Sequence, residues 1–290
     1  MYIYLFIIIL ISILIYLYRK NKSLNFGTFT QYDLTHINKK PDNIKSYICV
    51  IRHGTRYPTK KMYKLLDKEV QQHIDKKDIG KLTNVGYDEM ILFGKYLKSN
   101  YPHIFNDPQK YNIYSTTFER AKQSAHGCLT GLNTQNIKSI QYSYEIDRFL
   151  KVKDFFIKNP INSQNSTCLY SKLINVPYNK CDNNINTSYE YNKDKLTYYS
   201  ALKHGNKGKP FYDVLKNLIE RCKENSNSNG FVFFAHDSTL MPLYYLFHLL
   251  PSDLEYRNSE WLPFSARLEI FIDTDNNVYF YVNGNLKKQL

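Results

Sequence analysis

Two histidines stand beside charged residues that suit phosphate chemistry, at widely separated points of the chain. His53 lies in the segment 52–58, whose sequence is RHGTRYP, and His236 is followed directly by Asp237. An arginine fork binds two phosphate oxygens at once and stays charged at physiological pH. A histidine surrounded by such cations stays neutral more readily, and a neutral imidazole nitrogen is a nucleophile. The pattern predicts phosphoryl transfer with His53 as the attacking group.

Five further side chains would complete such a site. Arg52, Arg56 and Arg120 would bind the phosphate dianion, and His236 would contact one of its oxygens. Asp237 would act as general acid and give its proton to the leaving alkoxide. These steps need no metal ion and no cofactor. The sequence also holds no carboxylate cluster and no CxxC pair of the kind that binds metals.

Three residues close to His53 are candidate substrate contacts. They are Thr55, Lys60 and Lys61. The two lysines directly follow the 52–58 segment, so their ammonium groups could meet additional phosphates of a polyanionic substrate. The alternative for both is a solvated helix face, which is the usual place for lysine in a globular protein.

Short apolar runs precede three of these polar segments. Residues 47–51 lead into Arg52 and His53, residues 111–114 lead towards Arg120, and residues 231–235 lead into His236. Such runs are typical of buried strands, and helical spacing of apolar residues between them predicts an α/β fold. Side chains at the carboxyl ends of neighbouring strands can converge in one crevice. We expect a central mixed, mostly parallel sheet flanked by helices.

The remaining elements follow from periodicity and turn residues. Helices are expected over 62–74, 82–100, 118–132, 211–221 and 239–250, with a terminal hairpin of strands over 266–272 and 278–282. Residues 151–200 are rich in Asn, Ser and Lys and have weak periodicity. They are expected to form a reduced helical or loop cap inserted into a catalytic domain that spans residues 45–290.

The N-terminal segment differs from the rest of the chain. Residues 1–18 are apolar apart from one serine, and residues 19–44 form a basic flank and lead-in. Eighteen helical residues are just long enough to cross a hydrocarbon core, so we expect a signal-anchor helix and a single-pass membrane protein. A cleaved signal peptide and a buried helix are the alternatives. Sequons at Asn21, Asn165 and Asn186 favour a lumenal or extracellular catalytic domain, whereas the basic flank favours a cytoplasmic one.

The net charge of +13 fits a polyanionic partner, but the lysines are scattered along the chain. No zinc pattern or RNA-binding aromatic signature is present, so a small phosphorylated substrate is expected rather than nucleic acid. Among the five cysteines, Cys168 and Cys181 could form a disulfide in an oxidising compartment. Cys49 and Cys128 lie in apolar patterns that predict buried thiols.

The motif pair RHGxRxP and His-Asp resembles the histidine acid phosphatases, the second branch of the histidine phosphatase superfamily. Within that branch the likeness is greatest to the multiple inositol polyphosphate phosphatases, and it extends over roughly residues 26–285. The residues that carry it lie at 26–28, 52–59, 82–83 with Gly86, 114–117, Arg120, 124–125, 129–132, 198–199 and 263–266.

This resemblance implies a phosphohistidine formed on His53, with Asp237 at the position of the proton donor. It implies that Arg52, Arg56, Arg120 and His236 bind the phosphate. Inositol polyphosphate phosphatases usually carry His-Ala-Glu at the downstream motif, whereas this chain has His236-Asp237, the form common in acid phosphatases. The chain is also short around 151–200, where the family's helical cap lies.

Two other functions compete with a phosphomonoester hydrolase. A phosphoglycerate-mutase-like phosphotransferase would move phosphate between substrate positions with little net release. A catalytically inactive, membrane-anchored module would bind inositol phosphates or anionic lipid without turnover. The presence of both His53 and Asp237 argues against the inactive module, because a protein that only binds needs no proton donor.

Overall fold

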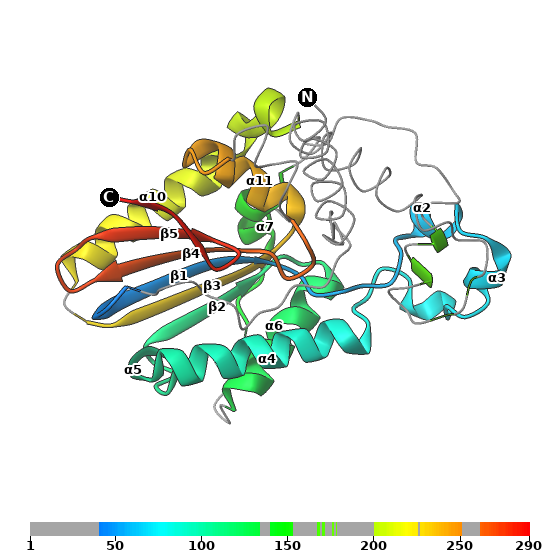
Figure 1. Cartoon of the computed structure of the whole chain (residues 1–290), viewed down its shortest axis with the longest axis horizontal. Coiled ribbons are helices and arrows are strands. Elements are labelled where there is room, and N and C mark those ends of the chain that lie inside the picture. The colour runs from blue at the N-terminus through cyan, green and yellow to red at the C-terminus, as the bar shows by residue number, and fades with distance from the viewer. Residues whose placement is uncertain are drawn as a thin grey trace, which may run out of the picture.

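The computed structural model describes residues 41–133, 140–152, 200–225, 227–250 and 262–290, together with residues 167, 168, 170, 171, 176 and 178 (Figure 1). The expected anchor at 1–18, most of the flank at 19–44 and most of the cap at 151–200 lie outside these residues. Among the described residues, no helix combines the length and the hydropathy of a membrane span. Cys168 is disulfide-bonded, and its expected partner Cys181 is not among the described residues.

A six-stranded sheet with the order β2-β3-β1-β4-β5-β6 forms the centre of the molecule. Its strands are β1 (Ile44–Arg52), β2 (Tyr111–Ser115), β3 (Asn229–Ala235), β4 (Arg267–Asp273), β5 (Val278–Val282) and β6 (Asn285–Gln289). Strand β3 pairs in parallel with both β1 and β2. The three strands that carry the predicted polar segments are therefore neighbours, and their carboxyl ends point the same way.

The other half of the sheet is antiparallel, which corrects the expectation of a mostly parallel sheet. Strands β4, β5 and β6 each run opposite to the neighbour before them in the sheet. For β5 and β6 the cause is local, because short turns join β4 to β5 and β5 to β6, and a short turn can only reverse the chain. Strand β6 was missed because four of its five side chains are polar and four are exposed. The Asn283-Gly284 pair before it has both φ angles positive, as a two-residue hairpin turn requires.

Helices cover both faces of the sheet (Figure 1). One face carries α4 (Asn84–Asn100), α5 (Pro102–Phe105) and α6 (Glu119–Leu132), and the other carries α7 (Tyr144–Leu150), α10 (Lys209–Glu224) and α11 (Asp237–Leu246). Alternate residues of β1 point into the helical layers on the two faces of the sheet. Tyr47, Cys49 and Ile51 pack with α4 and α6, while Ile48 and Val50 pack with α10 and α11. The two faces of the sheet are thus covered, and the polar segments that follow β1, β2 and β3 lie at its carboxyl edge.

The single helix expected over 62–74 is wrong. Two one-turn helices, α2 (Lys60–Tyr63) and α3 (Lys68–Gln71), occupy this stretch. The break comes at Asp67, whose carboxylate accepts the backbone N–H of Glu69 and so caps a new helix. The apolar side chains of the segment still point inward and form a small separate core with Tyr170 and Phe264. This small unit lies beyond the carboxyl edge of the sheet (Figure 1).

Candidate active site

The three predicted segments meet at the carboxyl edge of the parallel strands. The backbone N–H of His53 donates to the carbonyl of Ala235 at 3.1 Å, which ties the end of β1 to the end of β3. The N–H of Thr116 donates to the carbonyl of Phe234 at 3.2 Å and brings in the loop after β2. Sequence and structure therefore agree on the elements that surround His53.

His53 is buried, with 2% of its surface exposed. Its Nδ1 lies 2.9 Å from the carbonyl oxygen of Gly54. A carbonyl oxygen can only accept, so Nδ1 carries the proton and Nε2 keeps its lone pair. Burial lowers the pKa of His53 well below its ordinary value, and the cations Arg120 and Arg52 lower it further. The imidazole is thus neutral and presents one nucleophilic nitrogen.

Arg52 and Arg56 approach this histidine around the ring of Phe264. The guanidinium carbon of Arg52 lies 4.3 Å from the ring centre and that of Arg56 lies 5.9 Å from it, while the ring centres of His53 and Phe264 are 5.7 Å apart. Arg52 also donates to the carbonyl of Leu262 at 2.7 Å. Since Phe264 is fully buried, it forms a fixed apolar wall beside Arg52, while Arg56 is held by hydrogen bonds to the Tyr57 carbonyl and the Tyr170 hydroxyl.

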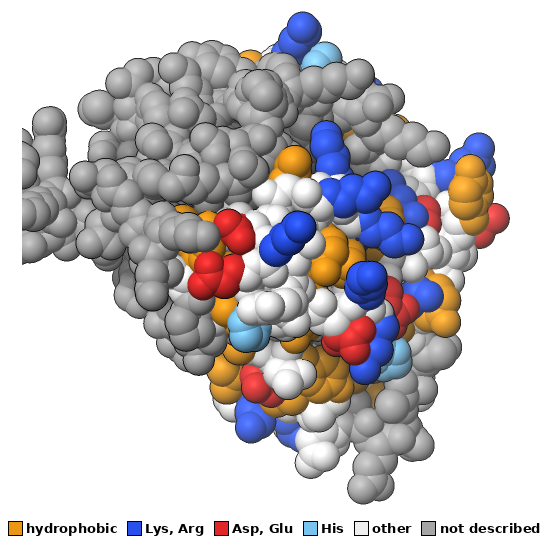
Figure 2. All heavy atoms as spheres, turned by 90° about the vertical axis from the view of Figure 1, so that its right-hand side faces the viewer, with side chains coloured by type: hydrophobic (Ala, Val, Ile, Leu, Met, Phe, Trp, Pro, Cys, Tyr) orange, Lys and Arg blue, Asp and Glu red, His pale blue; other side chains and the backbone are white. Residues whose placement is uncertain are grey.

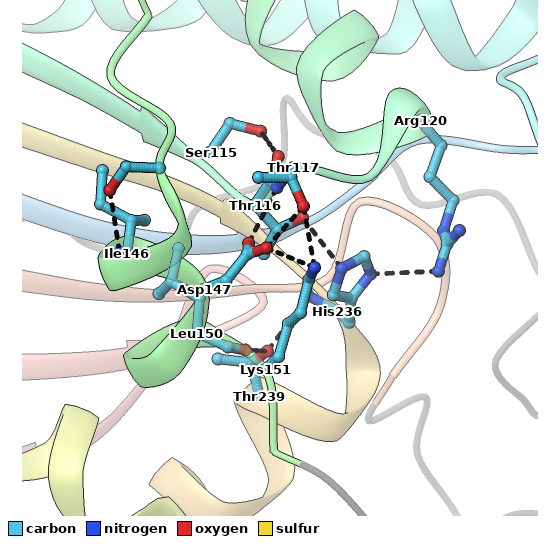
Figure 3. Close-up of polar contacts among 11 residues, drawn as sticks. Ser115, Thr116, Thr117, Arg120, Ile146, Asp147, Leu150, Lys151, His236 and Thr239 are labelled. Atoms are coloured by element: carbon cyan, nitrogen blue, oxygen red, sulfur yellow. Dashed lines mark hydrogen bonds and ion pairs between the residues drawn. The ribbon is translucent and has the colours of Figure 1, made fainter.

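Arg120, the second residue of α6, lies against His236. Its Nη2 is 3.5 Å from Nδ1 of His236, and Nε2 of His236 is 3.0 Å from the hydroxyl of Thr116 (Figure 3). A guanidinium can only donate, so Nδ1 accepts and Nε2 donates to Thr116. Burial and Arg120 lower the pKa of His236 to about 3. Burial lowers the pKa of Arg120 itself to about 10, which leaves the guanidinium charged at neutral pH.

Asp237 begins helix α11 directly after His236. One of its carboxylate oxygens lies 3.2 Å from Nη2 of Arg52, and the other accepts the backbone N–H of Ser238 at 2.8 Å. The side chain is 20% exposed, so it reaches the open side of the site. The structure thus brings together six side chains at this edge of the sheet: Arg52, His53, Arg56, Arg120, His236 and Asp237.

The structure gives Thr55 a different partner from the one expected. Its hydroxyl donates to the carboxylate of Glu89 at 2.7 Å, and its side chain is fully buried. It holds the loop in place and does not face a substrate. Lys60 and Lys61 lie exposed at the start of α2, and none of the described contacts joins them to His53 or to the arginines.

Glu89, on α4, is a site residue that the sequence reasoning missed. It accepts the backbone N–H of Thr55 at 3.0 Å as well as its hydroxyl, and it accepts the hydroxyl of Ser265 at 2.9 Å. Burial raises its pKa, while these hydrogen bonds favour the charged form. The available signal was a carboxylate on the inward face of α4, one residue before the buried Met90. Glu89 fixes the loop after β1 to the segment before β4.

The backbone of the loop after β1 also packs directly against helix α4. A Cβ atom at Gly54 would lie 2.4 Å from the carbonyl oxygen of Gly86, and one at Gly86 would lie 2.0 Å from the carbonyl oxygen of Thr55. Neither position can accept a side chain, because the colliding atoms belong to the backbone. The missing side chains let the loop and the helix make this close approach.

A second unpredicted set of contacts joins α7 to the loop after β2 (Figure 3). The Asp147 carboxylate accepts the backbone N–H of Thr117 at 2.8 Å, its hydroxyl, and the ammonium of Lys151. The Thr239 hydroxyl donates to the carbonyl of Leu150. These contacts lock the segments that carry Arg120 and His236 to one helix. No sequence pattern predicted these contacts, because residues 140–152 contain no motif and no long run of periodically spaced apolar residues.

Comparison with known proteins gives a family and a fold. The family model described as "Histidine phosphatase superfamily (branch 2)" matches residues 43–206. No curated protein matches the chain. Among solved structures, the phytase from D. castellii has a TM-score of 0.64 and 14% identity, over 90% of this chain and 78% of that one. The multiple inositol polyphosphate phosphatase of Bifidobacterium longum, in complex with inositol hexasulfate, has a TM-score of 0.56 and 12% identity, over 91% and 92%.

The likeness to these two structures concerns the fold, because so few residues are identical. The family model carries more weight, since it covers more than half of the chain and includes the segment 52–58 and Arg120. The shared fold and the convergence of the motif residues at one sheet edge agree with it. The chain therefore belongs to the histidine phosphatase superfamily, branch 2.

Proposed function

We propose that the chain hydrolyses phosphate monoesters through a phosphohistidine formed on His53. The observation that carries this proposal is the single lone pair of a buried, neutral imidazole, held by Gly54 among three arginines. A nucleophile of this kind attacks phosphorus without first losing a proton. The arginines supply the charge that the transferring phosphoryl group needs.

In the first step, Nε2 of His53 forms a bond to phosphorus while the bond between phosphorus and the ester oxygen breaks. The electron pair of that bond leaves with the oxygen, and the carboxylic acid of Asp237 gives this oxygen a proton. In the second step, water attacks the phosphohistidine, its proton passes to the Asp237 carboxylate, and His53 recovers its lone pair. The products are one alcohol and one inorganic phosphate.

The proposal requires Asp237 to hold a proton when substrate is bound. Without a ligand its carboxylate pairs with Arg52 at 3.2 Å and stands at the positive end of α11, and both favour the ionised form. A bound phosphate dianion would draw the Arg52 fork to itself and place negative charge beside the carboxylate. Both changes raise the pKa of a carboxyl group. Substrate binding would thus prepare the acid.

We further propose small phosphate esters, inositol polyphosphates among them, as the substrate class. Two proteins that share the fold are a phytase and an inositol polyphosphate phosphatase. The net charge of +13 suits a polyanion. Figure 2 looks onto the side of the molecule that carries α2 and α3, where lysine and arginine side chains gather among fewer acidic ones. Exposed lysines of this region include Lys60, Lys61, Lys64 and Lys68.

The test is phosphate release by the full chain from p-nitrophenyl phosphate and from inositol hexakisphosphate, each with a chelator present. We expect inorganic phosphate from both compounds, in step with the alcohol product. Transfer of phosphate between positions without net release would identify a phosphotransferase instead. Binding of both compounds without any turnover, across the acid and neutral range, would overturn the proposal in favour of a module that only binds.

The lowered pKa of His53 leads to a prediction for the pH profile. Because burial and Arg120 hold this pKa well below the ordinary 6.5, the nucleophilic form persists as the pH falls. We expect kcat/KM for p-nitrophenyl phosphate to show no loss with a midpoint near 6.5, and to fall only at clearly lower pH. In Arg120→Gln, which removes one cation, the acid limb should move upward. A wild-type midpoint near 6.5 would contradict the assignment of His53 as a histidine with a lowered pKa.

A further inference from the structure

A cavity of about 650 Å³ lies beside α7 and is lined by Tyr144, Asp147, Arg148, Lys151, Val152 and Lys207. The residues that α7 and its C-terminal end contribute follow a helical pattern. Tyr144, Asp147, Arg148 and Lys151 recur at intervals of three, one and three, so they share one face of the helix. Three cationic side chains and one carboxylate line the cavity, and Arg148 and Lys151 are the two cations that α7 and its C-terminal end supply.

Lys151 is held in place by its neighbours. Its ammonium donates to the hydroxyl of Thr117 at 2.9 Å and to the carboxylate of Asp147 (Figure 3). Asp147 is itself fixed, because it accepts the backbone N–H of Thr117 and is only 6% exposed. An ammonium has three N–H groups, and among the described residues only two of them have an acceptor. A quarter of the side chain is exposed, so a ligand can reach the ammonium.

Arg148 provides a second cation on the same face. Its side chain is exposed and forms no ion pair with a described residue. A guanidinium in this state gains most from a phosphate oxygen, because the planar fork can bind it with two hydrogen bonds. The pair of Arg148 and Lys151 thus offers a fork and a fixed ammonium at one opening.

The ring of Phe118 contacts Lys151 on one side and two residues of the candidate active site on the other. Phe118 is 43% exposed, and the Lys151 nitrogen lies 4.3 Å from its ring centre. The guanidinium carbon of Arg120 lies 4.6 Å from the same ring, and the ring of His236 lies 5.0 Å from it, edge-on. Two residues assigned to the phosphate being cleaved therefore contact the same side chain as Lys151.

We propose that Arg148 and Lys151 bind a second anionic group of the substrate while its reacting phosphate lies at His53. Phe118 forms the wall between the two anions and packs against the apolar part of the substrate that joins them. This inference rests on the proposed function and narrows it to phosphate esters that carry at least one further phosphate. It assigns the selectivity for these esters over simple monoesters to α7 and its C-terminal end, which hold none of the residues that take part in the proposed phosphoryl transfer.

The experiment compares two substrates with three variants of the full chain. Arg148→Gln and Lys151→Met each remove a cation from the cavity, and Lys95→Met removes one from the exposed surface of α4, on the opposite face of the sheet. For inositol hexakisphosphate we expect KM to rise about tenfold in each cavity variant, which corresponds to one charge-assisted hydrogen bond. For p-nitrophenyl phosphate, which has one phosphate, KM and kcat of Arg148→Gln should stay within about twofold of wild type. Lys95→Met should leave both substrates unchanged.

Each outcome decides one question. If the cavity variants change both substrates equally, or neither, the second anion site is wrong although the phosphatase activity stands. If Lys95→Met raises KM as much as they do, general electrostatic attraction explains the effect and the site is again wrong. Lys151→Met also loses a contact to Asp147, so a drop in kcat for both substrates in that variant alone would reflect a loosened loop. In that case the KM values of Arg148→Gln decide whether the second anion site exists. Absence of wild-type turnover would overturn the proposed function instead.

Discussion

Replacing His53 by alanine is expected to lower kcat for phosphate release by at least about 10⁴-fold, whatever the substrate. The change removes the only nitrogen that can bond to phosphorus in the proposed first step. Alanine fits the space, because His53 is buried between Phe264 and His236 and the smaller side chain adds no clash. The measurement is phosphate release by the full chain under conditions in which wild type turns over steadily.

Two controls make this result specific to the nucleophile. His53→Ala should still bind inorganic phosphate, since Arg52, Arg56 and Arg120 are unchanged, and its melting temperature should lie within a few degrees of that of wild type. An alkaline quench during turnover should trap phosphate on the wild-type chain and none on the variant. Activity within about tenfold of wild type would show that another group attacks phosphorus.

The second large effect is expected at Asp237. Asp237→Asn keeps the acceptor for the backbone N–H of Ser238 but cannot give up a proton. For an alkyl ester such as an inositol phosphate, kcat should fall about 10²–10⁴-fold, as for other lost general acids. Binding of inorganic phosphate should be unchanged or tighter, because Arg52 loses its competing carboxylate and the dianion loses a like charge.

The leaving group separates an acid from a merely structural carboxylate. p-Nitrophenolate leaves without a proton, so release of p-nitrophenol in the first turnover should be far less affected in Asp237→Asn than release of an alcohol. A structural role for Asp237 would slow both releases equally. Equal losses for the alkyl and aryl esters, with phosphate binding weakened, would therefore remove Asp237 from the proton-transfer step.

The sequence predicted which residues gather around His53 because two of the segments that carry them have their own signals. An apolar run that ends in Arg52 and His53, and another that ends at His236, each place charged residues where a buried strand must end. Parallel pairing of β1, β2 and β3 then brings them together. The side chains that fix these segments in place had no comparable signal in the sequence. Glu89 and Asp147 act across gaps of 34 and 30 residues on Thr55 and Thr117, and only the packed helices α4 and α7 bring them there.

The difference between segments with their own sequence signal and segments fixed by their partners also explains the errors in the predicted fold. Periodicity identified which side chains of residues 62–74 point inward, and these do pack together. It could not show that the chain breaks at Asp67, because the capping carboxylate and the inward pattern coexist there. Strand β6 has no apolar alternation and is held by its pairing with β5. Elements that depend on partners rather than on their own pattern were the ones that sequence reasoning missed or misjudged.

The hydrogen bond from Nδ1 of His53 to the carbonyl of Gly54 bears on the lifetime of the proposed intermediate. When phosphorus bonds to Nε2, the ring keeps its Nδ1 proton and becomes formally positive. A carboxylate in that position would neutralise this charge, whereas a carbonyl offers only a dipole. The surrounding arginines oppose the same charge. The proposal therefore implies an unstable phosphorylated ring with a good leaving group, which would pass the phosphoryl group to water and would not store it.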